Sequence, residues 1–166
     1  MCKKGINIPK ISDFPLGEEN TGYAQYFTGK SWLAPLTTNK DLNVPISNVT
    51  FEPGCRNNWH SHTGGQILIV VGGEGYYQER NKPGRKIVTG DIVEIAPNVE
   101  HWHRASPESW LSHLSIICNP QINENTWLEP VSDEAYMEAV AGELVRLDEI
   151  LAKVISVSLP VLSILY

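Results

Sequence analysis

Residues 54–66 read Gly-Cys-Arg-Asn-Asn-Trp-His-Ser-His-Thr-Gly-Gly-Gln, a stretch that places His60 and His62 two positions apart. Side chains at positions i and i+2 of a β-strand point to the same face, so these two imidazoles can reach one metal ion. Gln66 follows four residues later, and His101 ends a second segment that begins at Gly90. Three neutral imidazoles and one amide oxygen would leave room for water or a substrate on a divalent ion.

The composition limits what kind of protein can carry this site. The chain has 166 residues, 42% of them apolar, and its formal net charge is −6. This size predicts one globular domain, and the acidic balance disfavours nucleic acid or a membrane surface as a partner. No apolar segment follows the first residues, and three scattered cysteines indicate no disulfide framework, so we expect no signal peptide and a cytoplasmic protein.

The central part of the chain has the sequence pattern of an all-β domain. Short strand-like runs alternate with Gly and Pro turns, a pattern typical of a β-sandwich or β-barrel. The clearest runs are residues 32–36, 46–51, 66–71, 75–80, 85–88, 91–95, 101–105 and 110–117. We therefore expect an N-terminal arm over residues 1–22, a barrel domain over 23–130, and a C-terminal helix with an apolar tail over 131–166.

The C-terminal part changes to a helical pattern. Ser132 is a candidate N-cap, followed by Asp133 and Glu134, which the helix dipole favours in a first turn. Apolar residues then recur at steps of three and four from Leu144 onward, which predicts a helix packed on the barrel or on a second subunit. The last 13 residues have no charge but are too few to span a bilayer. We expect this tail to be buried, for example in a homodimer.

The two histidine segments together resemble the cupin family. The spacing Gly54-x5-His60-x-His62-x3-Gln66-x6-Gly73 is similar to the first cupin motif, and residues 90–101 are similar to the second. The resemblance implies a cupin jelly-roll β-barrel with a metal in its mouth. By position, His60, His62, Gln66 and His101 would be the metal ligands. Manganese would be the first choice of metal, with iron, nickel and zinc as alternatives.

Gln66 departs from the usual family pattern, in which a glutamate occupies this position. A neutral amide leaves the full charge of a divalent ion in place, whereas a carboxylate would cancel part of it. This difference favours Lewis-acid chemistry and disfavours any cupin activity that needs the glutamate as a base.

The segment after the second motif gives a narrower resemblance. Residues 101–114 read His-Trp-His-Arg-Ala-Ser-Pro-Glu-Ser-Trp-Leu-Ser-His-Leu, which resembles the cupins associated with carboxymuconolactone decarboxylase domains. Residues 131–166 contain no cysteine or histidine, so we expect no decarboxylase chemistry from the C-terminal helix. The segment also resembles manganese cupins with hydroxynitrile lyase activity, which have the same His/His/Gln/His ligands. In those proteins two further barrel histidines assist proton transfer, and His103 and His113 match their positions.

These observations lead to one main functional hypothesis and two alternatives. We expect a metal-dependent, lyase-type enzyme that acts on a small organic molecule, with His103 and His113 as catalytic proton-transfer groups. The first alternative is a non-catalytic cupin that binds or senses a small molecule at the same site. The second is an iron-dependent dioxygenase.

Overall fold

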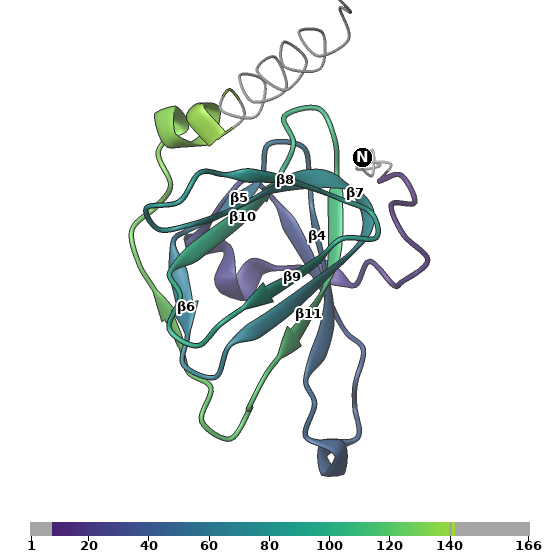
Figure 1. Ribbon diagram of the computed structural model, residues 1–166. Helices are drawn as coiled ribbons and strands as arrows, with labels where there is room; N and C mark the ends of the chain where they lie inside the picture. Colours follow the sequence, from purple (N-terminus) through teal and green to yellow (C-terminus); the bar gives the residue numbers. More distant parts are fainter. Residues whose placement is uncertain (1–7, 140, 142–166) are drawn as a thin grey trace, which may run out of the picture.

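The strands curl around a central space to form a barrel (Figure 1). The computed structural model describes residues 8–139 and residue 141. The elements are β1 (Glu18–Glu19), η1 (Thr21–Tyr26), β2 (Phe27–Thr28), β3 (Ser31–Pro35), η2 (Lys40–Leu42), β4 (Ile46–Phe51), β5 (Arg56–Asn57), β6 (His60–His62), β7 (Gln66–Glu79), β8 (Arg85–Val88), β9 (Ile92–Ile95), β10 (His101–Ala105), β11 (Leu111–Ile117) and β12 (Asn125–Trp127). The predicted all-β jelly-roll barrel is confirmed.

Strand β7 connects the two halves of the barrel. Its first half pairs with β9 and β11, and its second half pairs with β8 and β10, all antiparallel. The sequence predicted two separate runs here, 66–71 and 75–80, whereas the structure has one strand of 14 residues. Gly73 lies between the halves with φ of 72°, a left-handed conformation that side chains with a Cβ rarely adopt. The glycine lets the strand turn from one sheet to the other without ending.

The remaining pairings set the order β1-β3-β4-β11-β7-β10-β5-β2, with β6 and β12 attached beside β10. Alternate residues of each strand point into the barrel. Gln66, Leu68 and Val70 of β7 are buried in this way. The apolar core inside the barrel consists of Val49, Phe51, Cys55, Leu68, Val70, Tyr77, Ile87, Val93, Ile95, Ala105 and Leu111.

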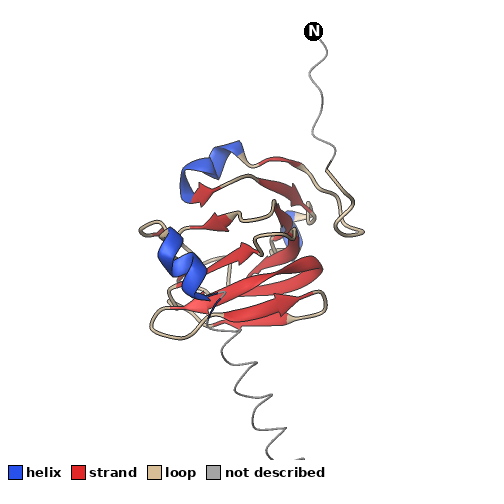
Figure 2. Ribbon diagram, turned by 90° about the horizontal axis from the view of Figure 1, so that it is seen from above, coloured by secondary structure: helices blue, strands red, loops and turns tan. Residues whose placement is uncertain are grey.

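A helix that begins at Asp133 lies against the outside of the strands (Figure 2). Ser132 caps it as predicted, because its Oγ accepts a hydrogen bond of 3.1 Å from the backbone N–H of Ala135. Tyr136 and Ala139 of this helix pack with Trp59 and Trp102 in a second apolar cluster. The predicted apolar stripe from Leu144 onward and the uncharged tail lie outside the described residues.

Among the helices of the described residues, none is long and apolar enough to cross a membrane.

Candidate metal centre

Two neighbouring strands bring three histidines together inside the barrel. Strand β6 pairs with β10 so that His60 lies directly opposite His101. His62 follows two residues after His60, and all three side chains are buried. The ring centroid of His60 is 4.1 Å from that of His101 and 5.1 Å from that of His62. His60 and His101, which are 41 positions apart in the sequence, thus share one small region of the barrel wall.

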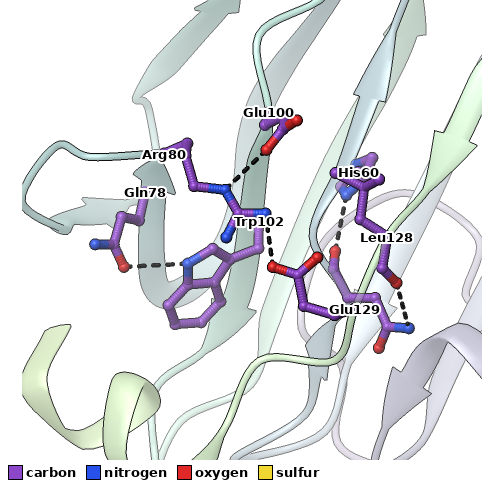
Figure 3. Close-up of polar contacts among 8 residues, drawn as sticks. His60, Gln78, Arg80, Glu100, Trp102, Leu128 and Glu129 are labelled. Atoms are coloured by element: carbon purple, nitrogen blue, oxygen red, sulfur yellow. Dashed lines mark hydrogen bonds and ion pairs between the residues drawn. The ribbon is translucent and has the colours of Figure 1, made fainter.

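Backbone carbonyls orient two of these rings. The Nδ1–H of His60 donates to the Asn58 carbonyl at 3.0 Å, a contact drawn in Figure 3, and that of His101 donates to the Val99 carbonyl at 2.9 Å. A carbonyl only accepts, so the proton of each neutral ring is on Nδ1 and the lone pair is on Nε2. Metal-bound histidines are oriented by this type of second hydrogen bond.

The atoms left without partners fit a metal ion. Within the described part of the chain, the buried atoms His62 Nε2, His101 Nε2 and Gln66 Oε1 have no hydrogen-bond partner. The amide of Gln66 is fixed by its other end, because its Nε2 donates to Ser115 Oγ at 2.9 Å. Buried polar atoms are rarely left unsatisfied in proteins. Two imidazole nitrogens and one amide oxygen of this kind are suitable ligands for a divalent cation.

His103 also belongs to a group of histidines that could bind a metal ion, although the sequence predicted a catalytic role for it. One nitrogen from each of His60, His101 and His103 lies within 4.8 Å of the other two. His62 is outside that three-histidine group, although its ring centroid is 5.6 Å from that of His101. The structure therefore brings His60, His62, Gln66, His101 and His103 into one region, and it forms a three-histidine group compatible with a divalent metal.

Burial keeps these imidazoles neutral. It lowers the pKa of His62 and of His101 to about 4 and holds the pKa of His60 and of His103 well below the usual range. The neighbouring imidazoles lower the pKa of His60 and His103 further. A neutral imidazole retains the lone pair that a metal ion or a proton needs, so the rings suit both coordination and proton transfer.

His103 and His113 form a pair deeper in the barrel. Their ring centroids are 4.7 Å apart with the rings nearly perpendicular, and Phe51 stacks in parallel with His103 at 5.4 Å. The pKa of His113 is lowered to about 3 by burial. The two predicted catalytic histidines thus adjoin each other beside the candidate ligands.

A cavity of about 370 Å³ opens onto these side chains. Among the described residues that line it, none carries a charge. Polar lining comes from histidine, asparagine, glutamine and serine side chains, and apolar lining comes mainly from Phe27, Leu33, Val49, Phe51 and Trp127. A small organic molecule with an apolar body fits this mixture.

Trp127 and Asn57 contact the candidate site, and neither was predicted from the sequence. Trp127 on β12 lies over His60 with the ring centroids 4.8 Å apart, and it stacks on Tyr26 at 4.5 Å. Asn57 on β5 contacts His103 with both ends of its side chain. Trp127 lies far from both motifs, and no pattern distinguishes Asn57 from Asn58, so the sequence offered no signal for either residue.

An ion-pair bridge supports the site from outside the barrel (Figure 3). Arg80 contacts Glu100 at 2.8 Å and Glu129 at 2.7 Å, and its guanidinium lies 3.9 Å from the ring centre of Trp59. Glu100 immediately precedes His101, and Glu129 follows β12. The bridge therefore connects the start of β10 with the segment that follows β12, and both segments lie beside the candidate site.

Comparison with known proteins agrees with this architecture. Residues 47–116 match the model of the cupin domain. An (R)-mandelonitrile lyase of Granulicella tundricola is 40% identical over 116 residues, which cover 69% of this chain and 88% of the relative. A crystal structure of a cupin-like protein of Thermotoga maritima has 45% identity and a TM-score of 0.72, covering 77% of this chain and 96% of that one.

A second solved structure supports the fold alone. The crystal structure of a predicted oxalate decarboxylase of Thermotoga maritima has 19% identity and a TM-score of 0.55, covering 66% of this chain and 93% of that one. The barrel, the two histidine motifs, the matching domain model and the lyase relative all lead to one conclusion: the chain belongs to the cupin family.

Proposed function

We propose that this cupin is a metal-dependent lyase that cleaves or forms small hydroxynitriles. The observation that carries the proposal is the convergence of unpartnered ligand atoms from His62, Gln66 and His101 beside the neutral His103–His113 pair. The Granulicella relative, named as a mandelonitrile lyase, supports the reaction type.

The residues that would hold the metal are His60, His62, Gln66 and His101, with manganese the first choice. A divalent cation there would supply Lewis-acid stabilisation of negative charge on a substrate oxygen. All four ligands are neutral, so they would cancel none of the cation's charge. Because the described lining of the cavity has no carboxylate either, the site favours a substrate group that becomes anionic during the reaction.

The remaining steps belong to protein side chains. In the cleavage direction the substrate hydroxyl loses its proton, the bond between its carbon and the nitrile carbon breaks with both electrons leaving on cyanide, and an aldehyde or ketone forms. His113, whose buried Nδ1 has no hydrogen-bond partner among the described residues, takes the hydroxyl proton. It then returns this proton to cyanide, which leaves as hydrogen cyanide, while His103 beside it donates a hydrogen bond to the reacting group. The apolar walls hold the organic body of the substrate and exclude water.

Cyanide release tests the proposal. The purified protein is stripped of metal, reloaded separately with manganese, iron(II), nickel or zinc, and assayed with mandelonitrile and smaller hydroxynitriles. We expect release with at least one metal and only background release from the stripped protein. Saturable binding without turnover across the panel, for every metal, would contradict the lyase and favour a non-catalytic binding cupin. Oxygen consumption by the iron-loaded protein would favour a dioxygenase.

The predictions of a homodimer and of a cytoplasmic setting stay predictions.

A further inference from the structure

Asn57 faces His103 across two paired strands. Strand β5 has only two residues and lies beside β10 (Figure 1). Its pairing with β10 places Arg56 opposite Arg104, so the next position of β5 lies opposite His103. Side chains of opposed residues point to the same face of a sheet. Asn57 is 3% exposed, and both it and His103 line the cavity.

Hydrogen bonding fixes which end of the Asn57 amide faces which group. The backbone N–H of His103 is 3.0 Å from Oδ1 of Asn57. Because a backbone N–H only donates, the amide oxygen must face it, and the amide nitrogen must face the imidazole. Nδ2 lies 3.1 Å from Nε2 of His103 and 3.4 Å from Nδ1.

The amide nitrogen in turn determines where the proton of His103 can be. An amide NH₂ only donates, so the ring nitrogen nearer to it must supply a lone pair. The nearer atom is Nε2. The neutral ring therefore carries its proton on Nδ1. Phe51 and His113 also contact this ring, but through ring stacking and an edge contact that favour neither tautomer.

From these contacts we propose that Asn57 is a positioning residue that holds His103 in one orientation and in the tautomer protonated on Nδ1. Its effect on catalysis rests on the proposed lyase function, whereas the tautomer does not. His103 can donate a hydrogen bond to the reacting group only when its protonated nitrogen faces the substrate. Without Asn57, His103 can populate both tautomers and turn its ring, so fewer enzyme molecules are competent for the chemical step.

The variant Asn57→Asp separates the two ends of the amide. It keeps an oxygen that can accept from the backbone N–H of His103, and it replaces the donor that faces the ring with an acceptor. The nearer ring nitrogen must then donate, so the proton is expected to move to Nε2. Asn57→Ala removes both contacts. The matched control is Asn48→Asp, the same change at a buried asparagine that bonds to the Pro15 carbonyl and Ser112 outside the cavity.

The decisive measurement is the long-range ¹H–¹⁵N spectrum of zinc-loaded protein with ¹⁵N-labelled histidine, because it identifies the protonated nitrogen of each neutral ring. We expect Nδ1–H for His103 in the wild type and in Asn48→Asp, and Nε2–H in Asn57→Asp. A wild-type spectrum with Nε2–H at His103 would overturn the proposal even if no Asn57 variant folds.

Steady-state kinetics of the metal-loaded lyase supply the second readout. Loss of the positioning contact in Asn57→Ala is expected to lower kcat about 10- to 100-fold with little change in KM. This loss is only part of the rate gain that general acid–base catalysis usually supplies. Asn48→Asp is expected to leave both constants unchanged. An unaltered kcat in Asn57→Ala would contradict the positioning role. If the wild type releases no cyanide, the lyase proposal fails, and the spectrum still decides the tautomer.

Discussion

Both faces of strand β10 contain buried polar groups without hydrogen-bond partners among the described residues, but the surroundings of these groups differ. Facing inward, His101 has an Nε2 without a partner beside similar atoms of His62 and Gln66. These atoms have lone pairs and come from three strands, and His62 and Gln66 also line the cavity. A single cation could satisfy them together, which is the arrangement expected of a metal centre.

Facing outward, Arg104 is fully buried, and its three guanidinium nitrogens have no hydrogen-bond partner among the described residues. Its guanidinium lies 3.9 Å from the ring centre of Tyr136 and 4.1 Å from that of Tyr76, and burial lowers its pKa to about 10. Aromatic faces stabilise a buried cation in this arrangement. Unpartnered buried atoms therefore indicate a ligand only where acceptors from several elements converge on free space.

The largest effect is expected when one of the proposed metal ligands on the inward face of β10 is removed. His101→Ala is expected to abolish stoichiometric metal binding and to reduce lyase activity more than about 100-fold, because loss of an outer hydrogen bond to a ligand alone costs 10- to 100-fold. Arg104→Met, on the opposite face of the same strand, is expected to bind metal normally. Elemental analysis of both purified variants after reloading checks the pair. Full metal content in His101→Ala would contradict the ligand assignment.

The barrel and its inward histidines could be predicted from the sequence because both follow from local patterns. Strand alternation places His60 with His62 and His101 with His103, and the spacing of the two motifs resembles that of cupins. All five histidines of the chain lie where these patterns put them, inside the barrel. Whether four of the residues bind a metal stays a prediction.

The remaining features depend on contacts between segments that are distant in sequence. Trp127 reaches His60 only because β12 pairs with β6. The grouping of His103 with His60 and His101 depends on how β6 docks on β10. Arg104 would be expected on the surface from its residue type, and it is buried because the helix beginning at Asp133 covers it with Tyr136. Local periodicity contains no information about such docking.

A second test addresses the outward cation. Arg104→Ala is expected to lower the free energy of unfolding by about 3 kcal/mol, because it removes a large buried side chain from between two rings. Arg104→Met fills much of the same volume without a charge and is expected to stay within about 1 kcal/mol of the wild type. Urea unfolding of the metal-free proteins measures both values. Equal losses in the two variants would show that the rings need the charge and not the volume.

A third test measures how acid affects stability through the buried imidazole of His113. The pKa of His113 is about 3 in the folded protein, below its usual value in an unfolded chain, so the unfolded chain binds more protons between these values. Stability is therefore complete above about pH 6.5 and falls as the pH is lowered. At pH 5 this single group is expected to cost up to about 2 kcal/mol.

Urea midpoints at pH 7 and pH 5 are compared in the metal-free wild type and in His113→Gln, and the difference between the two losses isolates that contribution, because the other four buried histidines are present in both proteins. His113→Gln removes the titrating group and is expected to lose less stability on acidification than the wild type. Arg104→Met is the control from the outer face, because an arginine remains charged at both pH values and its removal should leave the pH dependence unchanged. An acid loss in His113→Gln as large as that of the wild type would contradict the assignment.

The smallest expected effect concerns the helix that seals the outward face. Ser132→Ala removes the acceptor for the Ala135 N–H and is expected to cost about 1 kcal/mol, the usual value of an N-cap. Ser132→Asp restores an N-cap acceptor and should return the stability to that of the wild type. Because the described residues of this helix pack on the outer face with Arg104, Trp59 and Trp102, metal content and kcat should be unchanged in both variants. A loss of metal in Ser132→Ala would show that the two faces of β10 are coupled, so that the outer packing also maintains the inner site.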